Sequence, residues 1–365
     1  MADWAVANGS NHNVLNWERR VEHEALKMMK FTSFWGRSPG SAIRVVDDLK
    51  RGGDMSAAGD TVYTTLLVNL TGSGVAGDAQ MQGSEEPLVM HRQTVVINQL
   101  RNAVKSAGRI TNQRTFINFS EEARAVLQKW AADVMDKWSA NQLAGNTGET
   151  NTNFTGMQSA TAPTSASGNM RILYGPTANN DTTEASLSVS TQSNFQLTML
   201  DEAVAIAETS TPAMQPVQTD DGPKWIAVLH PYQIFSLKTD ATDARVTWYD
   251  YNKSVIQGGG KDIIGNPMKG ALGEYNNVLI HSDSRIPLAP STTTVRRGVF
   301  FGAQAGTAAF GRDGGTETRF KYDEQEEDYK NRLGIGVRTI GGMKKNVYNS
   351  IDFATIVLSS RAAAP

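Results

Sequence analysis

Residues 59–70 alternate between two faces with a period of two, which predicts a β-strand. One face of this strand carries Val62, Thr64, Leu66, Val68 and Leu70. Residues 88–100 form a second extended segment that runs back, and the connection 71–87 contains Gly72, Gly74, Gly77 and Gly83. Glycine accepts backbone conformations that other residues avoid, so this connection is not expected to be a regular element. The pattern therefore predicts a long β-hairpin over 59–104 that projects from the body and reaches a neighbouring subunit.

Apolar residues spaced every three to four positions predict one long amphipathic helix at 121–144. Its apolar stripe consists of Val126, Leu127, Trp130, Ala131, Val134 and Trp138. Ser120 is the expected N-cap, and Gly145 is the expected stop beyond the C-terminal end. At about 1.5 Å per residue the helix would be roughly 36 Å long, enough to brace a flat domain.

Residues 1–58 are predicted to form an N-terminal arm with one helical stretch within 17–36. One side of the stretch carries Val21, Ala25, Met28 and Met29, and an aromatic cluster follows with Phe31, Phe34 and Trp35. Aromatic side chains of this size need a surface that covers them. That surface belongs either to another part of the same chain or to a neighbouring subunit, and the sequence leaves both open.

The rest of the chain mixes strands and helices without a regular alternation, which indicates the α+β class. Residues 146–192 are rich in Ser, Thr, Asn and Gly and are expected to form an ordered, mostly loop-like excursion. Leu197, Leu200, Val204 and Ala207 mark one expected helix, with Ser193 as its cap. Another is expected to begin at Pro231, where the missing N–H costs nothing. Strands are expected at 224–230, 277–282, 292–302 and 318–324, with two or three more within 334–360.

Composition narrows the classes of partner. The chain has 365 residues, a net charge of −2 and no cysteine. A nearly neutral chain has no overall field that would attract it to nucleic acid or to an anionic membrane. The lack of cysteine excludes disulfides and thiolate catalysis and fits maturation in a reducing cytoplasm. No apolar run approaches the roughly 18 residues of a spanning helix, so no membrane partner is expected.

Motifs that resemble catalytic sites lack necessary residues. Gly36–Gly40 spells G-x-S-x-G, but Pro39 follows the serine and has no N–H for an oxyanion hole. Gly258–Lys261 resembles a phosphate loop, yet Val255 replaces its first glycine and Asp262 follows the lysine. The five histidines lie far apart in the sequence. We therefore expect no catalytic set, no cofactor and no metal, and predict that the protein is not an enzyme.

Charged residues cluster by sign near the C-terminus. The acidic run consists of Asp323, Glu324, Glu326, Glu327 and Asp328, and the basic set of Lys330, Arg332, Lys344 and Lys345, with Arg338 between them. A solvated face explains such a run, and so does a head-to-tail contact in which each subunit offers both signs of charge. Together with Leu66, Val68, Leu70, Glu85 and Glu86 of the hairpin, these residues are the candidate contacts between subunits.

Four blocks of sequence carry a family resemblance. They are GDTVYTTLLVNLTGSGVAGD with SEEPL and INQLRNAVKSAGRITNQR (59–114), IIGNPMKGALGEYNNVLIHSDSRIP (263–287), GVFFGAQAGTAAFGR (298–312) and the segment 319–358. In this order they resemble the tailed-bacteriophage major capsid proteins with the HK97-type fold, over more than half of the chain. Ser84 departs from the asparagine that the family pattern suggests, which puts one local contact in question.

The resemblance implies an α+β, HK97-like fold in four parts: an N-terminal arm (1–58), an extended loop (59–104), a peripheral domain (105–192 with 318–365) and an axial domain (193–317). The helix at 121–144 would be the spine helix of the peripheral domain, which would also hold the insert 146–192. The implied function is to form hexamers and pentamers of an icosahedral head that encloses double-stranded DNA. Separate scaffolding, portal and cement proteins are expected partners, with assembly in the host bacterial cytoplasm and a final place in the virion.

The same residues predict how the shell is held together. No lysine occurs between Gly59 and Val104, so we expect shells without isopeptide cross-links. No long charged helical segment precedes the arm, so we expect little proteolytic trimming. The near-balanced charge of 121–144 predicts weak, salt-sensitive contact with DNA. Two alternatives stay open: a binding module that grips another head protein, and a hydrolase whose catalytic set the sequence does not reveal.

Overall fold

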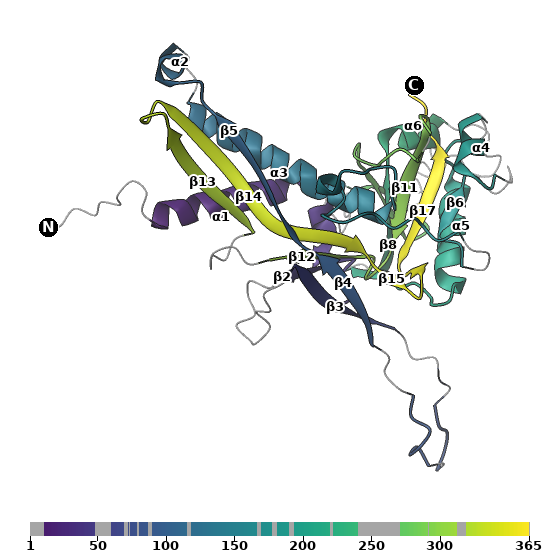
Figure 1. Ribbon diagram of the computed structural model, residues 1–365. Coiled ribbons are helices and arrows are strands. Elements are labelled where there is room, and N and C mark those ends of the chain that lie inside the picture. The colour runs from purple at the N-terminus through teal and green to yellow at the C-terminus, as the bar shows by residue number, and fades with distance from the viewer. Residues whose placement is uncertain are drawn as a thin grey trace, which may run out of the picture.

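The computed structural model describes the chain apart from residues 1–10, 48–59, 69–71, 73, 79, 87–89, 115–117, 166–168, 177–180, 190–192, 220–221, 240–270, 291, 312–318 and 365. Two β-sheets dominate the described residues, and a long helix runs from the outer end of one toward the other (Figure 1). A two-stranded hairpin leaves the body on a third side. The predicted α+β class is confirmed.

The first sheet has six strands around one long central strand, β14 (Arg332–Lys345). One half of β14 pairs with β13 (Phe320–Glu327) and with β5 (Asn98–Lys105), and the other half pairs with β12 (Gly306–Phe310). The sheet continues through β2 (Ile43–Asp47) to β1 (Trp35–Gly36). The N-terminal arm thereby supplies two strands to a sheet made mostly from the other end of the chain.

Helix α3 (Phe119–Leu143) packs on β14, and α1 (Asn11–Met28) packs against both α3 and β13. The predicted long helix is confirmed, but its N-cap is Asn118 and not Ser120. The Asn118 side chain accepts a hydrogen bond from the Ser120 N–H at 3.2 Å, which places Ser120 within the first turn. At the other end Gly145 adopts φ +58°, and a Cβ there would lie 2.5 Å from the Thr161 carbonyl oxygen, so the expected glycine stop is confirmed.

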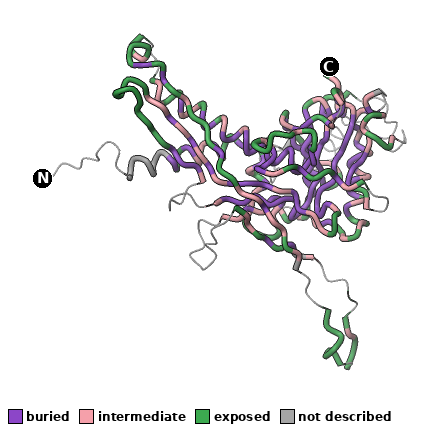
Figure 2. Tube along the Cα trace, in the orientation of Figure 1, coloured by how far each residue is buried: buried purple, intermediate pink, exposed green. Residues whose placement is uncertain are grey.

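The second sheet has seven strands. Its order is β6 (Ile172–Tyr174), β17 (Thr355–Arg361), β11 (Val295–Phe301), β8 (Gly222–Leu229), β10 (Val278–Ser282) and β9 (Ala271–Tyr275), with β7 (Val217–Thr219) paired to β8. The strands β8, β11 and β17 are buried along most of their length, as Figure 2 shows by their purple colour. Three helices lie beside this sheet in Figure 1: α4 (Glu184–Val189), α5 (Leu197–Thr209) and α6 (Pro231–Thr239).

Three strands pair with strands from other segments of the expected domain division. β6, from the expected peripheral insert, and β17, from the expected C-terminal return, both pair within the seven-stranded sheet. β12, from the expected axial segment, pairs instead with β14 and β2. Backbone pairing thus links segments that are far apart in sequence, and each sheet takes strands from more than one of the expected segments.

Two smaller predictions concern helix starts. The start of α6 at Pro231 is confirmed. The helix expected around Leu197 is α5, but it begins at Leu197 and Ser193 does not cap it: Gln196 holds the cap position without a side-chain bond. The Ser193 hydroxyl donates instead to the Asp181 carboxylate at 2.7 Å. The described residues of the excursion 146–192 are mostly loop, as expected, with η3 (Thr152–Phe154), β6 and α4 as the regular elements among them.

The hairpin pairs β3 (Thr61–Leu67) with β4 (Met90–Val96) in antiparallel register. After Ile97 the chain leaves the hairpin as β5 and joins the six-stranded sheet, and α2 (Arg109–Arg114) follows at the outer end. Figure 1 shows the hairpin directed away from the body, and Figure 2 shows its tip exposed. A projecting hairpin is found, but it ends near Val96 and not at residue 104 as predicted, because residues 98–104 pair with β14 in the six-stranded sheet.

Candidate assembly surfaces

The base of the hairpin is fixed to the body by contacts from both strands. The His91 ring meets the edge of Tyr348 with centroids 4.2 Å apart, and the Gln93 side chain donates to the Val347 carbonyl. Tyr348 and Val347 form β15 (Val347–Tyr348), which pairs with β16 (Ile351–Asp352). From β2, the Arg44 guanidinium donates to the Thr65 carbonyl at 3.0 Å. These contacts set the direction in which the hairpin leaves the body.

The apolar candidates on the first strand have different surroundings. Leu66 is buried in the core of its own subunit, so its side chain is not available to a neighbour and that candidate contact is corrected. Val68 is half-buried and packs against the same core. Leu70 lies outside the described residues. An alternating pattern shows which residues share a face, but it does not show whether that face meets the same subunit or another one.

The acidic candidates of the tip shape its backbone. Glu86 accepts a hydrogen bond from the Gly72 N–H at 2.6 Å, across the two sides of the tip. Glu85 accepts one from the Gly83 N–H at 2.7 Å. Both side chains remain exposed. The two carboxylates therefore stabilise the tip conformation while they keep surface that a second molecule can contact.

The N-terminal arm docks on its own chain, which decides the alternative that the sequence left open. Phe31 and Phe34 are buried, and Phe34 meets the edges of the His281 and Phe301 rings at centroid distances of 4.9 and 5.4 Å. The expected face of α1 is partly wrong: Met29 is buried, whereas Met28 is 44% exposed. α1 ends at Met28, and Met29, the first residue after the helix, packs into the core in its place.

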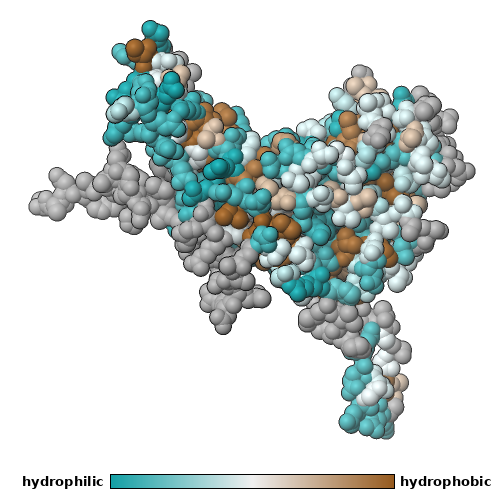
Figure 3. All heavy atoms as spheres, viewed as in Figure 1, coloured by the Kyte–Doolittle hydropathy of each residue, from teal (hydrophilic) through white to brown (hydrophobic). Residues whose placement is uncertain are grey.

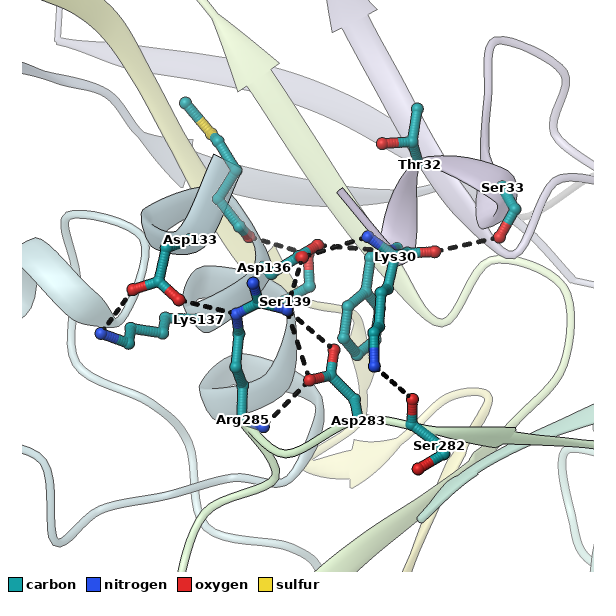
Figure 4. A network of polar contacts seen from close by, with 12 residues as sticks. Lys30, Thr32, Ser33, Asp133, Asp136, Lys137, Ser139, Ser282, Asp283 and Arg285 are labelled. Carbon is teal, nitrogen blue, oxygen red and sulfur yellow. Dashed lines mark hydrogen bonds and ion pairs between the residues drawn. The ribbon is translucent and has the colours of Figure 1, made fainter. Parts of the chain in front are cut away.

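A buried polar cluster connects the arm, α3 and the loop after β10 (Figure 4). The Asp136 carboxylate accepts hydrogen bonds from the backbone N–H groups of Lys30 and Phe31, each at 3.1 Å. The Arg285 guanidinium lies 2.9 Å from the same carboxylate. From the arm, the Lys30 ammonium donates to the Ser282 carbonyl at 2.8 Å. We call this set the Asp136 joint, since one wholly buried side chain holds together three segments far apart in sequence.

Arg285 is the cation that the carboxylates at the centre of the joint share. Arg285 also contacts Asp133 at 2.8 Å and Asp283 at 3.4 Å, so three carboxylates share one guanidinium. Burial raises the pKa of Asp136 to about 6, and Asp283 acts in the same direction. The two backbone donors and Arg285 lower it by less. Asp136 is one of the charges of the helix predicted at 121–144, and its burial removes it from the exposed face of that helix. Its spacing of three from Asp133 is the local signal that the two share a face.

The acidic run of β13 is exposed, and its members pair within the subunit. Arg338 contacts Asp323 at 2.8 Å, Arg124 contacts Glu324 at 3.3 Å, Lys330 contacts Glu326 at 3.7 Å, and Lys105 pairs with Glu327. Asp328 accepts from the Asn331 side chain at 3.3 Å, and Arg332 is exposed nearby. Ion pairs this exposed contribute little to stability, typically below about 1 kcal/mol. They leave the surface free to exchange partners.

The basic candidates at the end of β14 are less exposed than the acidic run of β13. Lys345 is wholly buried, and its ammonium pairs with Asp352 at 2.9 Å, so it is corrected from a surface contact to a core ion pair. Burial lowers the pKa of Lys345. Lys344 is half-buried. The remaining exposed candidates gather at two places, the hairpin tip and the outer end of β13 and β14, which lie far apart in Figure 1.

Two other features, metal sites and membrane-spanning helices, are not found in the described part of the chain. No group of three or more histidine or acidic side chains there has the arrangement of a metal site. Among the described helices, none combines the length and the apolar character needed to cross a lipid bilayer.

The fold places the chain in a known class. Its structure superposes on the capsid of Ralstonia phage GP4 with a TM-score of 0.74 at 25% identity, covering 100% of this chain and 96% of that one. The capsid of cyanophage Pam1 shares the fold with a TM-score of 0.67 at 19% identity, with full coverage of both chains. The shared architecture is that of HK97-like phage shell proteins, as the resemblance in sequence implied.

Sequence comparison identifies the family. Residues 5–364 match the family described as phage capsid protein, and the chain therefore belongs to that family. It is 26% identical to the major capsid protein of Pseudomonas phage KPP25, over 94% of this chain and 91% of the relative. The prediction of a phage major capsid protein is thereby confirmed.

Proposed function

We propose that copies of this capsid protein assemble into the hexamers and pentamers of an icosahedral head that encloses double-stranded DNA, without catalytic turnover. The projecting hairpin carries the proposal. A two-stranded sheet on its own is at best marginally stable in water. Beyond its fixed base, the described tip residues bond to one another through Glu85 and Glu86. A neighbouring subunit supplies the surface that such an arm lacks.

The expected parts fit this role. The six-stranded sheet with α3 is proposed as the peripheral domain and the seven-stranded sheet as the axial domain. Each subunit would contribute one arm and receive another, so removing a subunit breaks several interfaces at once and modest contacts add along the lattice. Scaffolding, portal and cement proteins remain proposed partners, and packaged DNA would be contacted weakly and without sequence preference.

The test is deletion of residues 72–83. The base contacts at His91, Gln93 and Arg44 stay in place, so the subunit is expected to melt at nearly the wild-type temperature. Negative-stain microscopy is expected to show shells for the full chain and dispersed subunits for the deletion. Normal shells from the deletion variant would contradict the proposed role of the arm. A stable monomer from the full chain under all assembly conditions would instead favour a module that binds another head protein.

A further inference from the structure

The turn between β13 and β14 has an uncommon backbone. Asp328, Tyr329 and Lys330 adopt φ values of 56°, 52° and 68°, all in the left-handed region. Residues with a Cβ rarely adopt this region, and glycine, asparagine and aspartate tolerate it best. Tyrosine has neither the small size nor the short polar side chain that eases the conformation. Tyr329 therefore occupies a position where asparagine or glycine would fold more easily.

The turn is held in this conformation by its neighbours. The Arg109 guanidinium, at the start of α2, donates to the Lys330 carbonyl at 3.0 Å, and the Arg109 N–H donates to the Asn331 side chain at 3.3 Å. The Asn331 N–H donates to the Asp328 carbonyl at 3.0 Å. A second element thus holds the backbone that follows Tyr329, and the bond from Asn331 to Asp328 closes the turn around it. The conformation of the turn is set within the subunit.

Tyr329 is fully exposed at 104%, and Ile110 on α2 beside the turn is 64% exposed. Both belong to the outer end of the molecule in Figure 1, and Figure 3 shows hydrophobic atoms among hydrophilic ones there. A strained turn that directs an aromatic ring into water destabilises an isolated subunit. Tyrosine is among the residues that most often anchor protein interfaces. We propose that Tyr329 anchors a contact between copies of this chain in the assembled shell.

The charges around the turn favour a second copy as the partner. Exposed residues of both signs surround Tyr329, namely Glu326, Asp328, Lys330, Arg332 and Arg109. A surface with both signs side by side can meet the same surface on another copy with opposite charges opposed. A partner whose surface carries one dominant sign of charge would be repelled by the residues of the same sign around Tyr329. The inference rests on the proposed function, because it assigns one interface of the same shell.

The test separates folding from assembly at one position. Tyr329→Asn removes the ring and places a residue that accepts positive φ, so the melting temperature of the subunit is expected to stay the same or rise. The concentration needed for assembly, followed by light scattering, is expected to rise at least about tenfold, as loss of an interface anchor does. Tyr329→Phe keeps the ring at the same φ and is the matched control, expected to assemble like the wild type.

A thiol probe tests the contact without removing the tyrosine. The chain has no cysteine, so Lys330→Cys introduces a single thiol next to Tyr329. Its reaction with a maleimide is expected to be fast in dispersed subunits and at least about tenfold slower in shells, because the contact covers it. The same shells after disassembly provide the control.

The outcomes are distinguishable. Assembly of Tyr329→Asn at the wild-type concentration, or a thiol equally reactive in shells and subunits, would overturn the Tyr329 contact and leave the shell function standing. Protection of the thiol only after another head protein is added would overturn the second copy as the partner. If the unchanged chain forms no shells, the proposed function fails and the contact falls with it.

Discussion

Asp136 makes the stability of this subunit depend on pH. Burial raises its pKa from 3.8 to about 6, so between these values the folded chain holds a proton that the unfolded chain releases. Stability from this group is therefore fully present below about pH 4 and is lost as the pH rises through 6. The shift corresponds to a change on the order of 3 kcal/mol in the free energy of unfolding.

Asp136→Asn is expected to remove this dependence. The amide oxygen can still accept from the arm backbone, but it carries no charge that titrates. The difference in melting temperature between variant and wild type should therefore grow in favour of the variant as the pH rises from 4 to 6.5. Calorimetry of dispersed subunits measures this difference at each pH. Melting temperatures of variant and wild type that change in parallel with pH would contradict the role given to Asp136.

Asp133→Asn is the control, because its pH response has the opposite sign. Burial raises the pKa of Asp133, but hydrogen bonds and charge from Arg285 and Lys137 outweigh that effect and lower it. Its contribution to stability is present above its unfolded pKa of 3.8 and is lost as the pH falls through the lower, folded value. The Asp133→Asn variant should therefore lose stability relative to the wild type above pH 4.

At the scale of elements, the short β15–β16 unit controls the projecting hairpin. Tyr348 of β15 meets His91 of β4, and an aromatic pair of this kind contributes about 0.5–1.5 kcal/mol. We expect Tyr348→Ala to lower subunit stability by about that amount and to raise hydrogen exchange in β3 and β4 selectively. Amides in β5 and β14 should stay protected, because their pairing does not involve Tyr348. Tyr348→Phe keeps the ring, and its amides should exchange like those of the wild type. A uniform increase in hydrogen exchange across β3, β4, β5 and β14 would contradict a specific role of Tyr348 in holding the hairpin.

At the scale of the whole molecule, the shell is expected to be held without covalent bonds between subunits. An isopeptide bond from the extended loop needs a lysine amine, and the sequence between Gly59 and Val104 has none. Purified particles that are boiled in denaturant should therefore migrate as single chains on a gel. A ladder of multimers would contradict the prediction. Particle strength would then rest on the arms and on surfaces such as the Tyr329 turn.

Local pattern was enough to predict the elements whose contacts are local or whose faces differ strongly in polarity. The alternation in 59–70 and the glycines after it predicted the hairpin, and the apolar stripe at 121–144 predicted α3. Pro231 marked the start of α6 because its ring fixes φ and its missing N–H is harmless there. Each of these signals lies within a few residues, so no knowledge of the rest of the chain is needed to interpret them.

Tertiary structure decided the features that depend on distant partners. The sequences of β6, β12 and β17 do not show which sheet each strand joins, because pairing is set by backbone groups of strands far away in sequence. Lys345 and Asp136 look like surface charges until Asp352 and Arg285 are placed beside them. The left-handed turn at Tyr329 contains no glycine, the residue that usually marks such a turn in a sequence. Hydrogen bonds that involve Arg109 and Asn331 hold its conformation instead. The sequence by itself determined which elements form and what class of protein they make; which groups are buried, paired or left exposed for assembly was determined only when the whole chain had packed.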